Sequence, residues 1–392
     1  MRAGWFQRAP SHKEVLGMTI TRRDFLKGTT AAVVGTWVSG YGLEPTSLAT
    51  AQDQQAEKDY VVKLGYYNCD HMTAAPVAKD AGIFDEMGLK VYVTGNGQVP
   101  EAMAAGQMDI GYIGVERMVR ARMKGAPIFV AAQNHLGGSM YIVVRQGIND
   151  PKELVGKKLA LHKSGKTPEK ISGEWVRFAA SSGIPVEGTH YELFDMADKD
   201  QFLALKLGQL DGYLTCDPWG SMAEYDGCGR IMHAAVKMPS GKWGTCCVYS
   251  MNANFATAYP ELAKKMILAH SKAIQFIYTR PLKAAEIFEK NYGVPLEVAL
   301  MTIFKKTVEE NRTLTWDLRL ENVREALDWD LKHGILAEIG NPADYVRTDL
   351  LVQAGTDNFD TFIKEKVDPV FPLSMTYGDW KKKAYSIEKQ TG

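Results

Sequence analysis

The sequence lacks an excess of charge of either sign. Lysine and arginine together number 46, and aspartate and glutamate together also number 46. A nucleic-acid-binding domain normally carries a strongly basic face, so this balance argues against nucleic acid as a partner. The balance still permits a small anionic ligand, because backbone N–H groups and helix N-termini can bind an anion without net positive charge.

Long apolar runs are also missing. A membrane-spanning helix needs roughly 20 consecutive apolar residues, and no stretch of the chain reaches that length. The composition, with 45% hydrophobic and 23% charged residues, is that of an ordinary globular protein. At 392 residues the chain is long enough for two domains, since a domain usually takes roughly 100–200 residues.

The short motifs of the common enzyme classes are absent as well. We find no Ser/His/Asp set, no dinucleotide fingerprint, and neither CxxC nor HExxH spacing. Lys163 to Thr167 reads Lys-Ser-Gly-Lys-Thr, but the first glycine of a Walker A loop and its spacing are missing. We therefore expect a binding protein and not an enzyme, with no cofactor and no metal ion.

The first 51 residues carry the parts of an export signal. Thr21 to Lys27 resembles the twin-arginine signal, in which paired arginines precede Phe-Leu-Lys. A short, weakly apolar run follows up to about Gly42, and Ala49-Thr50-Ala51 suits a cleavage site. No cysteine follows the run, so we expect no lipid anchor. The prediction is a periplasmic protein exported by the twin-arginine translocase and cleaved near Ala51; the alternative is a basic N-terminal helix of a cytosolic protein.

Two segments of the chain repeat one pattern. Residues 104–112 and 206–213 each contain a short helical run that stops at Gly-Gln, then an apolar residue, an aspartate and a brief strand. The glycines, Gly106 and Gly208, suit the left-handed position just past a helix end. Each strand leads into a polar turn, and ligands of open α/β sheets bind beyond the carboxyl ends of strands. The repeat therefore predicts two α/β lobes that face a shared cleft.

Strand and helix signals alternate along most of the chain, which is typical of an α/β fold. Beyond residue 260 the pattern becomes mostly helical, with prolines near the helix starts. The strand expected over 245–251 follows the second lobe in the sequence, so the chain could cross back there to the first lobe. The other expected strands cover 61–67, 89–94, 128–132, 140–144, 191–194 and 230–233, with one after each copy of the repeat, and the expected helices cover 74–84, 168–182, 260–276, 281–292, 295–310 and 317–333.

These elements suggest four segments. Residues 1–51 form an N-terminal extension with the signal peptide, and residues 59–147 form the first lobe. Residues 148–240 form the second lobe, and residues 241–392 return to the first lobe and add C-terminal helices.

Several short motifs, in their order, resemble a known family. They are Gly-Ile-Phe at 82–84 followed by Gly-Leu-Lys-Val at 88–91, the two Gly-Gln-x-Asp elements, the segment from Asp150 to Leu161, and Asp217-Pro218-Trp219. Together they are similar to the periplasmic substrate-binding proteins of ABC importers for nitrate, bicarbonate, sulfonates and taurine. That group shares its fold with thiamine-pyrimidine synthases.

The resemblance implies an α/β, two-lobe Venus-flytrap fold with a mostly helical C-terminal part. It also implies a function: the protein would close on a small ligand, such as a sulfonate, nitrate or a related organic or oxyanion, and deliver it to an ABC permease of the inner membrane. Two alternatives remain open. One is an enzyme of the thiamine-pyrimidine synthase type, and the other is a periplasmic metal- or cofactor-binding protein that uses Cys69, His71 and Cys216.

The resemblance and the expected strand ends together supply candidate ligand-binding residues. Residues 163–167 could instead be only a capped helix start, and Trp219 could pack instead of stacking on a ligand. Glu116 and Asp217 would repel an anion, so either they pair with lysines or the ligand carries a cationic group. The candidates are Tyr67, Asn68, Cys69, His71, Thr73, Asn96, Gln98, Val115, Glu116, His135, Ser164, Gly165, Thr167, Cys216, Asp217, Trp219 and Cys246.

The sequence has five cysteines, an odd number that leaves at least one thiol unpaired or a mixture of pairings in an oxidising compartment. Cys69, Cys216 and Cys246 lie at expected strand ends together with two histidines, and such soft ligands suit copper or zinc. Without a recognised metal-binding spacing, buried structural thiols or a disulfide between Cys216 and Cys228 are the more ordinary outcomes. Adjacent cysteines such as Cys246 and Cys247 are usually separate core thiols.

Overall fold

The computed structural model describes residues 57–391, except for 68, 96, 138–139, 162–169 and 235–236. All of them belong to the second of the two units into which the chain divides, Gln52–Gly392. The expected export signal and its cleavage site lie outside the described residues.

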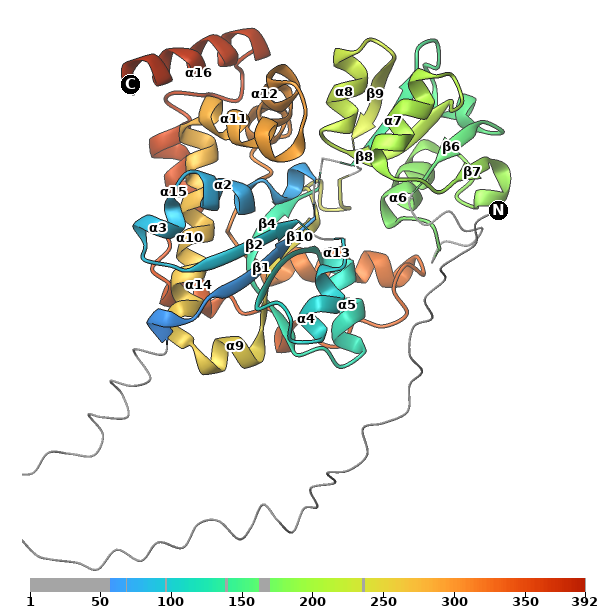
Figure 1. The fold of residues 1–392 in the computed structure, drawn as a ribbon. Coiled ribbons are helices and arrows are strands. Elements are labelled where there is room, and N and C mark those ends of the chain that lie inside the picture. Colours follow the sequence, from blue (N-terminus) through green and yellow to red (C-terminus); the bar gives the residue numbers. More distant parts are fainter. Residues whose placement is uncertain are drawn as a thin grey trace, which may run out of the picture. The chain divides into compact units, whose positions relative to one another are not determined.

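The first lobe is built on a five-stranded mixed sheet in the order β2-β1-β3-β10-β4. Strand β1 (Val62–Tyr66) runs parallel to β2 (Val91–Gly95) and to β3 (Ile110–Gly114). Strand β10 (Thr245–Asn252) lies antiparallel between β3 and β4 (Ile128–Leu136) (Figure 1). The prediction that the late strand returns to the first sheet is therefore confirmed.

The second sheet repeats this arrangement in the order β7-β6-β8-β5-β9. Strand β6 (Lys158–Ala160) is parallel to β7 (Glu192–Phe194) and to β8 (Gly212–Cys216). Strand β5 (Met140–Arg145) lies antiparallel between β8 and β9 (Gly229–Ala234), in the place that β10 takes in the first sheet.

The Gly-Gln-x-Asp repeat has the same structural role in both sheets. Gly106 and Gly208 have φ angles of 69° and 70°, the left-handed conformation that glycine adopts without steric cost. Each aspartate then accepts a hydrogen bond from the backbone of the neighbouring parallel strand. Asp109 accepts from the N–H of Lys63 at 2.8 Å, and Asp211 accepts from the N–H of Lys158 at 3.0 Å. The aspartates thereby fix strand register at the start of β3 and β8.

Strand β5 departs from the expected division of the chain. The sequence predicts that residues up to 147 belong to the first lobe, whereas β5 pairs with β8 and β9 of the second sheet. The chain therefore passes to the second sheet before Met140. A local sequence pattern predicts that a strand forms, but not which strands it pairs with. The partners of β5 are β8 and β9, which lie far from it in the sequence. The remaining limits of the division stay a prediction.

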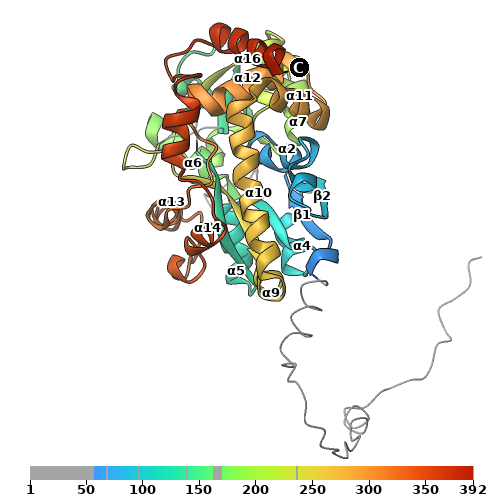
Figure 2. The ribbon, with the colours of Figure 1, turned by 90° about the vertical axis from the view of Figure 1, so that its left-hand side faces the viewer.

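Helices cover the sheets, and the longest of those described, α10 (Pro260–Thr279), buries one face against the first lobe (Figure 2). It begins at a proline, whose fixed φ and missing N–H suit the first helical position. The other α-helices are α2 (Ala74–Asp80), α3 (Ile83–Glu86), α4 (Val99–Ala104), α5 (Val115–Met123), α6 (Gly173–Ser182), α7 (Asp198–Lys206), α8 (Trp219–Tyr225), α9 (Ala253–Ala258), α11 (Pro281–Tyr292), α12 (Leu296–Phe304), α13 (Leu320–Lys332), α14 (Asp349–Gln353), α15 (Phe359–Phe362) and α16 (Tyr377–Thr391).

The core follows the two sheets. The largest apolar cluster joins the first sheet to the C-terminal helices and includes the buried Trp316 and Trp380. Two smaller clusters pack within the second lobe, one around Trp175 and one around Tyr213. Among the described residues, no helix has both the length and the apolar character needed to cross a membrane.

A buried ammonium group joins the two lobes. Lys306 lies in a π-helical turn (Lys305–Glu309) that follows α12, and its side chain is fully buried. Its Nζ lies 3.1 Å from Asp70 Oδ2 in the first lobe, 2.7 Å from Glu310 Oε2 and 3.0 Å from the hydroxyl of Tyr141 on β5. A backbone hydrogen bond of 3.0 Å from Asp70 N–H to the carbonyl of Asp217 also crosses between the lobes.

We expect Lys306→Met to destabilise the protein by about 3–5 kcal/mol, because removing one partner leaves buried carboxylates without their counter-charge. The matched control is Lys283→Met, since Lys283 forms an exposed pair with Glu286 and such pairs contribute about 0–1 kcal/mol. Urea unfolding followed by tryptophan fluorescence measures both variants. Similar, small losses in the two variants would contradict the structural role of Lys306.

Candidate ligand-binding site

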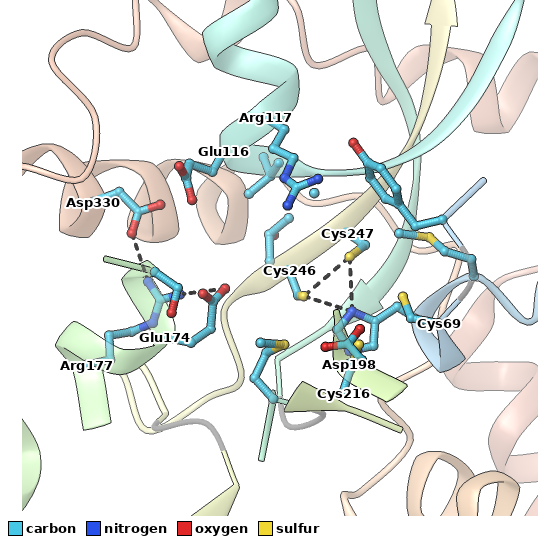
Figure 3. A pocket seen from close by; sticks show the side chains of 18 residues that line it. Cys69, Glu116, Arg117, Glu174, Arg177, Asp198, Cys216, Cys246, Cys247 and Asp330 are labelled. Atoms are coloured by element: carbon cyan, nitrogen blue, oxygen red, sulfur yellow. Dashed lines mark hydrogen bonds and ion pairs between the residues drawn. The ribbon is translucent and has the colours of Figure 1, made fainter. Parts of the chain in front are cut away.

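A pocket of about 320 Å³ lies where strand ends of the two sheets meet. From the first lobe it receives the turn after β1, the start of α5 after β3, and the beginning of β10. From the second lobe it receives the beginning of β5, the start of α6, and the end of β8 (Figure 3). Since β1, β3 and β8 each reach it with their carboxyl ends, the pocket has the position that ligands take in open α/β sheets.

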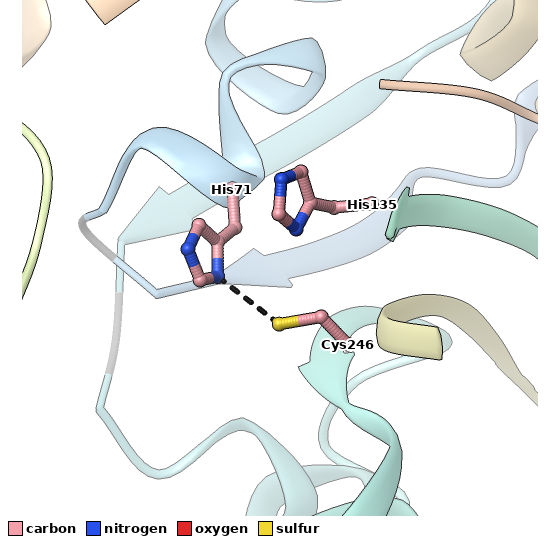
Figure 4. A group of neighbouring side chains, drawn as sticks. All are labelled: His71, His135 and Cys246. Carbon is pink, nitrogen blue, oxygen red and sulfur yellow. Dashed lines mark hydrogen bonds between the residues drawn. The ribbon is translucent and has the colours of Figure 1, made fainter. Parts of the chain in front are cut away.

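One wall of the pocket is rich in sulfur and imidazole. The Sγ atoms of Cys246 and Cys247 are 3.4 Å apart, and His71 Nδ1 lies 3.5 Å from the first and 3.3 Å from the second. The rings of His71 and His135 stack with centroids 4.4 Å apart and an interplanar angle of 10°. Figure 4 shows His71 and His135 next to Cys246. Both adjacent cysteines thus line the pocket, and Cys247 also belongs to the buried core of the first lobe, as expected of a core thiol.

A second pair of thiols comes from the two lobes. Cys69 and Cys216 lie with Asp70 in a group whose ligand atoms are all within 4.8 Å of one another. All five cysteines are free. The disulfide between Cys216 and Cys228 is therefore not formed, and the thiol of Cys228 donates instead to the carbonyl of Ala223.

Charged side chains also line the pocket. Arg177 pairs with Asp330 at 2.8 Å and with Glu174 at 3.5 Å. Glu116 pairs with Arg120 at 2.8 Å. The guanidinium of Arg117 lies 4.9 Å from the centre of the Tyr67 ring. The wall thus offers both cationic and anionic groups to a ligand.

Asp217 and Glu116, which looked incompatible with an anionic ligand, both have partners within the protein. Asp217 is fully buried, and its carboxylate accepts hydrogen bonds from the N–H and hydroxyl of Ser221 at 2.8 and 2.7 Å. Lys305 Nζ lies 3.9 Å from the same carboxylate. Glu116 pairs with an arginine, as described above. The expected pairing with a lysine therefore applies to Asp217, whereas the partner of Glu116 is an arginine.

The protonation states of the sulfur-rich wall follow from its neighbours. The hydrogen bond from Cys247 outweighs burial and, with His71, holds the pKa of Cys246 well below its usual range. Burial alone would lower the pKa of His71, but Asp70 and Cys246 outweigh it and the pKa is raised. Burial and the charge of His71 lower the pKa of His135 to about 4. The neighbours of Cys246 thus favour its thiolate, and Asp70 and Cys246 favour a protonated His71, whereas His135 is shifted toward its neutral form.

The predicted site residues separate into three groups. Seven line the pocket: Tyr67, Cys69, His71, Val115, Glu116, Cys216 and Cys246. Thr73, Gln98, His135, Asp217 and Trp219 are described but are not part of its lining. Asn68, Asn96, Ser164, Gly165 and Thr167 lie outside the described residues.

The residues of the second group have other roles. The hydroxyl of Thr73 donates to the carbonyl of Asp70, and Gln98 is exposed at the start of α4. Trp219 packs on Phe202 with ring centroids 5.9 Å apart, which is the packing alternative left open by the sequence. His135 is fully buried against His71, so it supports the pocket wall from behind.

Part of the wall is not predicted from the sequence, notably Arg117, Glu174, Arg177 and Asp330. Arg117 directly follows Glu116 at the start of α5, so the same strand-end argument extends to it by one residue. Arg177 and Asp330 lie within α6 and α13, and only the tertiary packing of these helices directs them to the pocket.

Comparisons with known proteins place these features in context. Residues 54–290 match the family model described as the NMT1-like family. The taurine-binding periplasmic protein of Escherichia coli (strain K12) is 25% identical over 169 residues, which cover 42% of this chain and 50% of that protein. The match thus spans half the length of this relative.

Solved structures of low sequence identity share the fold. The alkanesulfonate-binding protein SsuA from Xanthomonas axonopodis pv. citri, bound to MOPS, superposes with a TM-score of 0.61 at 18% identity, over 73% of this chain and 97% of that one. The periplasmic nitrate-binding protein NrtA from Synechocystis PCC 6803 gives 0.60 at 16% identity, over 83% and 98%. The predicted two-lobe fold is confirmed.

An enzyme has the same fold. The desulfurization enzyme DSZB superposes with a TM-score of 0.57 at 14% identity, over 75% of this chain and 98% of that one. Fold alone therefore does not separate binding from catalysis, although most of the similar proteins are binding proteins.

Asp330, in the pocket wall, makes the stability of the protein depend on pH. Burial, with Glu116 and Glu174, outweighs Arg177 and raises the pKa of Asp330 from 3.8 to about 7. A carboxyl whose pKa is raised by folding stabilises the protein below its unfolded pKa, and this contribution is lost as the pH rises through the folded pKa.

We therefore expect wild type to lose stability relative to Asp330→Asn as the pH rises from about 4 to about 7, because the amide cannot ionise. Melting temperatures measured across this range test the expectation. Asp85→Asn, at an exposed position of α3, is the control and should follow wild type. Parallel curves for Asp330→Asn and wild type would contradict the assignment.

Proposed function

Because this chain belongs to the NMT1-like family, we propose that it is the periplasmic solute-binding component of an ABC importer. It leaves the cytoplasm through the twin-arginine translocase and is cleaved near Ala51. It then closes on a small ligand, of the sulfonate, nitrate or related organic or oxyanion class, and delivers it to the permease. It acts as a binding protein and not as an enzyme.

The observation that supports this proposal best is that both lobes contribute residues to the pocket wall. Residues 114–117 reach the pocket from the first lobe, while Arg177 and Cys216 reach it from the second. A ligand that contacts both groups stabilises the closed arrangement of the lobes, which is the hinge closure typical of periplasmic binding proteins. Closure also gives a permease a surface that differs between loaded and empty protein.

The charges of the wall support a ligand with an anionic group. Arg177 is paired with Asp330 and Glu174. Among the described residues, Arg117 forms no such ion pair with a carboxylate and instead lies over the Tyr67 ring. We therefore propose that Arg117 binds the anionic group of the ligand, since a guanidinium donates strong hydrogen bonds to oxyanions. Glu174 and Asp198 also face the pocket, so a ligand that adds an amine, as an amino-sulfonate does, matches both signs of charge.

A panel of taurine, longer alkanesulfonates and nitrate should therefore contain a ligand that raises the melting temperature. Ligand at 100 times its Kd adds about 2.7 kcal/mol to the free energy of unfolding. Arg117→Met should weaken that ligand by about 10–100-fold, because a hydrogen bond to a charged group contributes about 1.5–3 kcal/mol. Arg324→Met, at an exposed position of α13, is the control and should bind as wild type does.

Two results would contradict the proposal. One is a panel in which no compound shifts the melting temperature, and the other is wild-type binding by Arg117→Met. Mass spectrometry of the recovered ligand separates binding from catalysis. The proposal requires the ligand to be released unchanged, whereas a product would favour the enzyme alternative, to which Cys246, with its lowered pKa and its position beside His71, is suited.

A further inference from the structure

We propose that His71, His135 and Cys246 form a site for one thiophilic d¹⁰ cation, Zn(II) or Cu(I), in the wall of the pocket, with Cys247 as the nearest additional ligand. The inference goes beyond the transport role, because it depends only on the geometry of this wall and not on which solute the pocket takes.

The separations of the ligand atoms match a shared ion. In a tetrahedral zinc site the Zn–S and Zn–N bonds of about 2.3 and 2.0 Å place a nitrogen and a sulfur about 3.5 Å apart. His71 Nδ1 lies 3.5 Å from Cys246 Sγ and 3.3 Å from Cys247 Sγ. One nitrogen of His135 completes the group, in which all three ligand atoms lie within 4.8 Å of one another.

A β-bulge or similar irregularity in β10 lies where the two sulfurs come together. Successive side chains of a regular strand point to opposite faces of the sheet, so neighbouring cysteines would normally separate. In β10 the pairing with β4 shifts register between Thr245 and Cys247, and again between Cys247 and Val248. Such bulges redirect side chains and are common next to functional sites. Here the irregularity leaves both thiols next to His71.

Hydrogen bonds hold this irregular backbone in place. The side-chain amide of Gln133 donates to the carbonyl of His135 at 2.9 Å and to the carbonyl of Cys247 at 3.0 Å. The amide of Asn134 donates to the carbonyl of His71 at 2.6 Å. The three segments that supply ligands are therefore fixed to one another before any ion arrives, as a pre-organised site requires.

The surroundings of His71 are those of a metal-binding histidine. Its Nδ1 faces the sulfurs, while its Nε2 lies 3.6 Å from Asp70 Oδ1. A carboxylate on the far nitrogen orients the ring and raises its basicity in many metal sites. Asp70 is in turn held by Lys306, 3.1 Å from its other oxygen. This outer shell distinguishes the group from a chance meeting of thiols and rings.

The chemistry of the ligands selects the ion, and the pocket supplies its path. Thiolate and imidazole favour Zn(II) and Cu(I), whereas Mg²⁺ and Ca²⁺ require oxygen ligands. His71, Cys246 and Cys247 all line the pocket, so an ion reaches them from the same opening as a solute. The other thiol group, Cys69 with Asp70 and Cys216, contains no imidazole and is the weaker candidate.

The test is a titration of the chelator-stripped, reduced, full chain with Zn(II) alone and, separately and anaerobically, with Cu(I) alone. A chromophoric chelator competes in each arm. We expect one equivalent to bind in at least one arm, and the tighter arm identifies the ion. Cys246→Ser should weaken binding at least 100-fold. Cys228→Ser is the matched control, because its thiol contacts Ala223 away from the pocket, and it should bind as wild type does.

Cobalt(II) gives a second readout that does not depend on affinity. The wild-type complex should show a sulfur-to-cobalt charge-transfer band that Cys246→Ser loses, with circular dichroism confirming that the variant is folded. The absence of stoichiometric binding in both arms would overturn the proposal. An equal loss of metal affinity in Cys228→Ser would also overturn it. So would a loss of metal affinity in Cys216→Ser while Cys246→Ser binds the ion normally. The solute panel, repeated in the presence of chelator, shows separately whether the transport role holds.

Discussion

The buried charge of Lys306 is the interaction on which the other features of the site depend. Its ammonium group lies between Asp70 of the first lobe and Glu310, within reach of Tyr141 of the second. Burial would lower the pKa of Lys306, but Glu310 and Asp70 outweigh it, so the pKa is raised and the charge is retained. The lobes are therefore joined by a buried group that has partners in both.

The same charge shapes the pocket. Burial raises the pKa of Asp70 to about 6, and the charges of Lys306 and His71 oppose this rise and favour the carboxylate. Asp70 faces one nitrogen of His71, and the other nitrogen faces the two thiols of β10. Stability at the lobe junction and the chemistry of the pocket wall thus depend on one chain of contacts from Lys306 to Cys246.

The sequence predicts the repeated parts of this molecule well, because they depend on local chemistry. Gly106 and Gly208 mark left-handed positions that few other residues tolerate, and the strand ends beyond them lead to the pocket. His71 and Cys246 were found by the same strand-end reasoning. What the sequence does not reveal depends on distant contacts. Tertiary packing determines the partners of β5 and the irregularity of β10 at Cys246 and Cys247. It also determines how the helices bring Arg177 and Asp330 to the pocket wall.

A crystal structure of the protein with a bound member of the solute panel tests the central claim most directly. The account predicts that the ligand lies between the sheets and contacts residues 114–117 of the first lobe as well as Arg177 or Cys216 of the second. A ligand that contacts only one lobe, or that lies away from this pocket, would contradict the claim that the two repeated halves close on a solute.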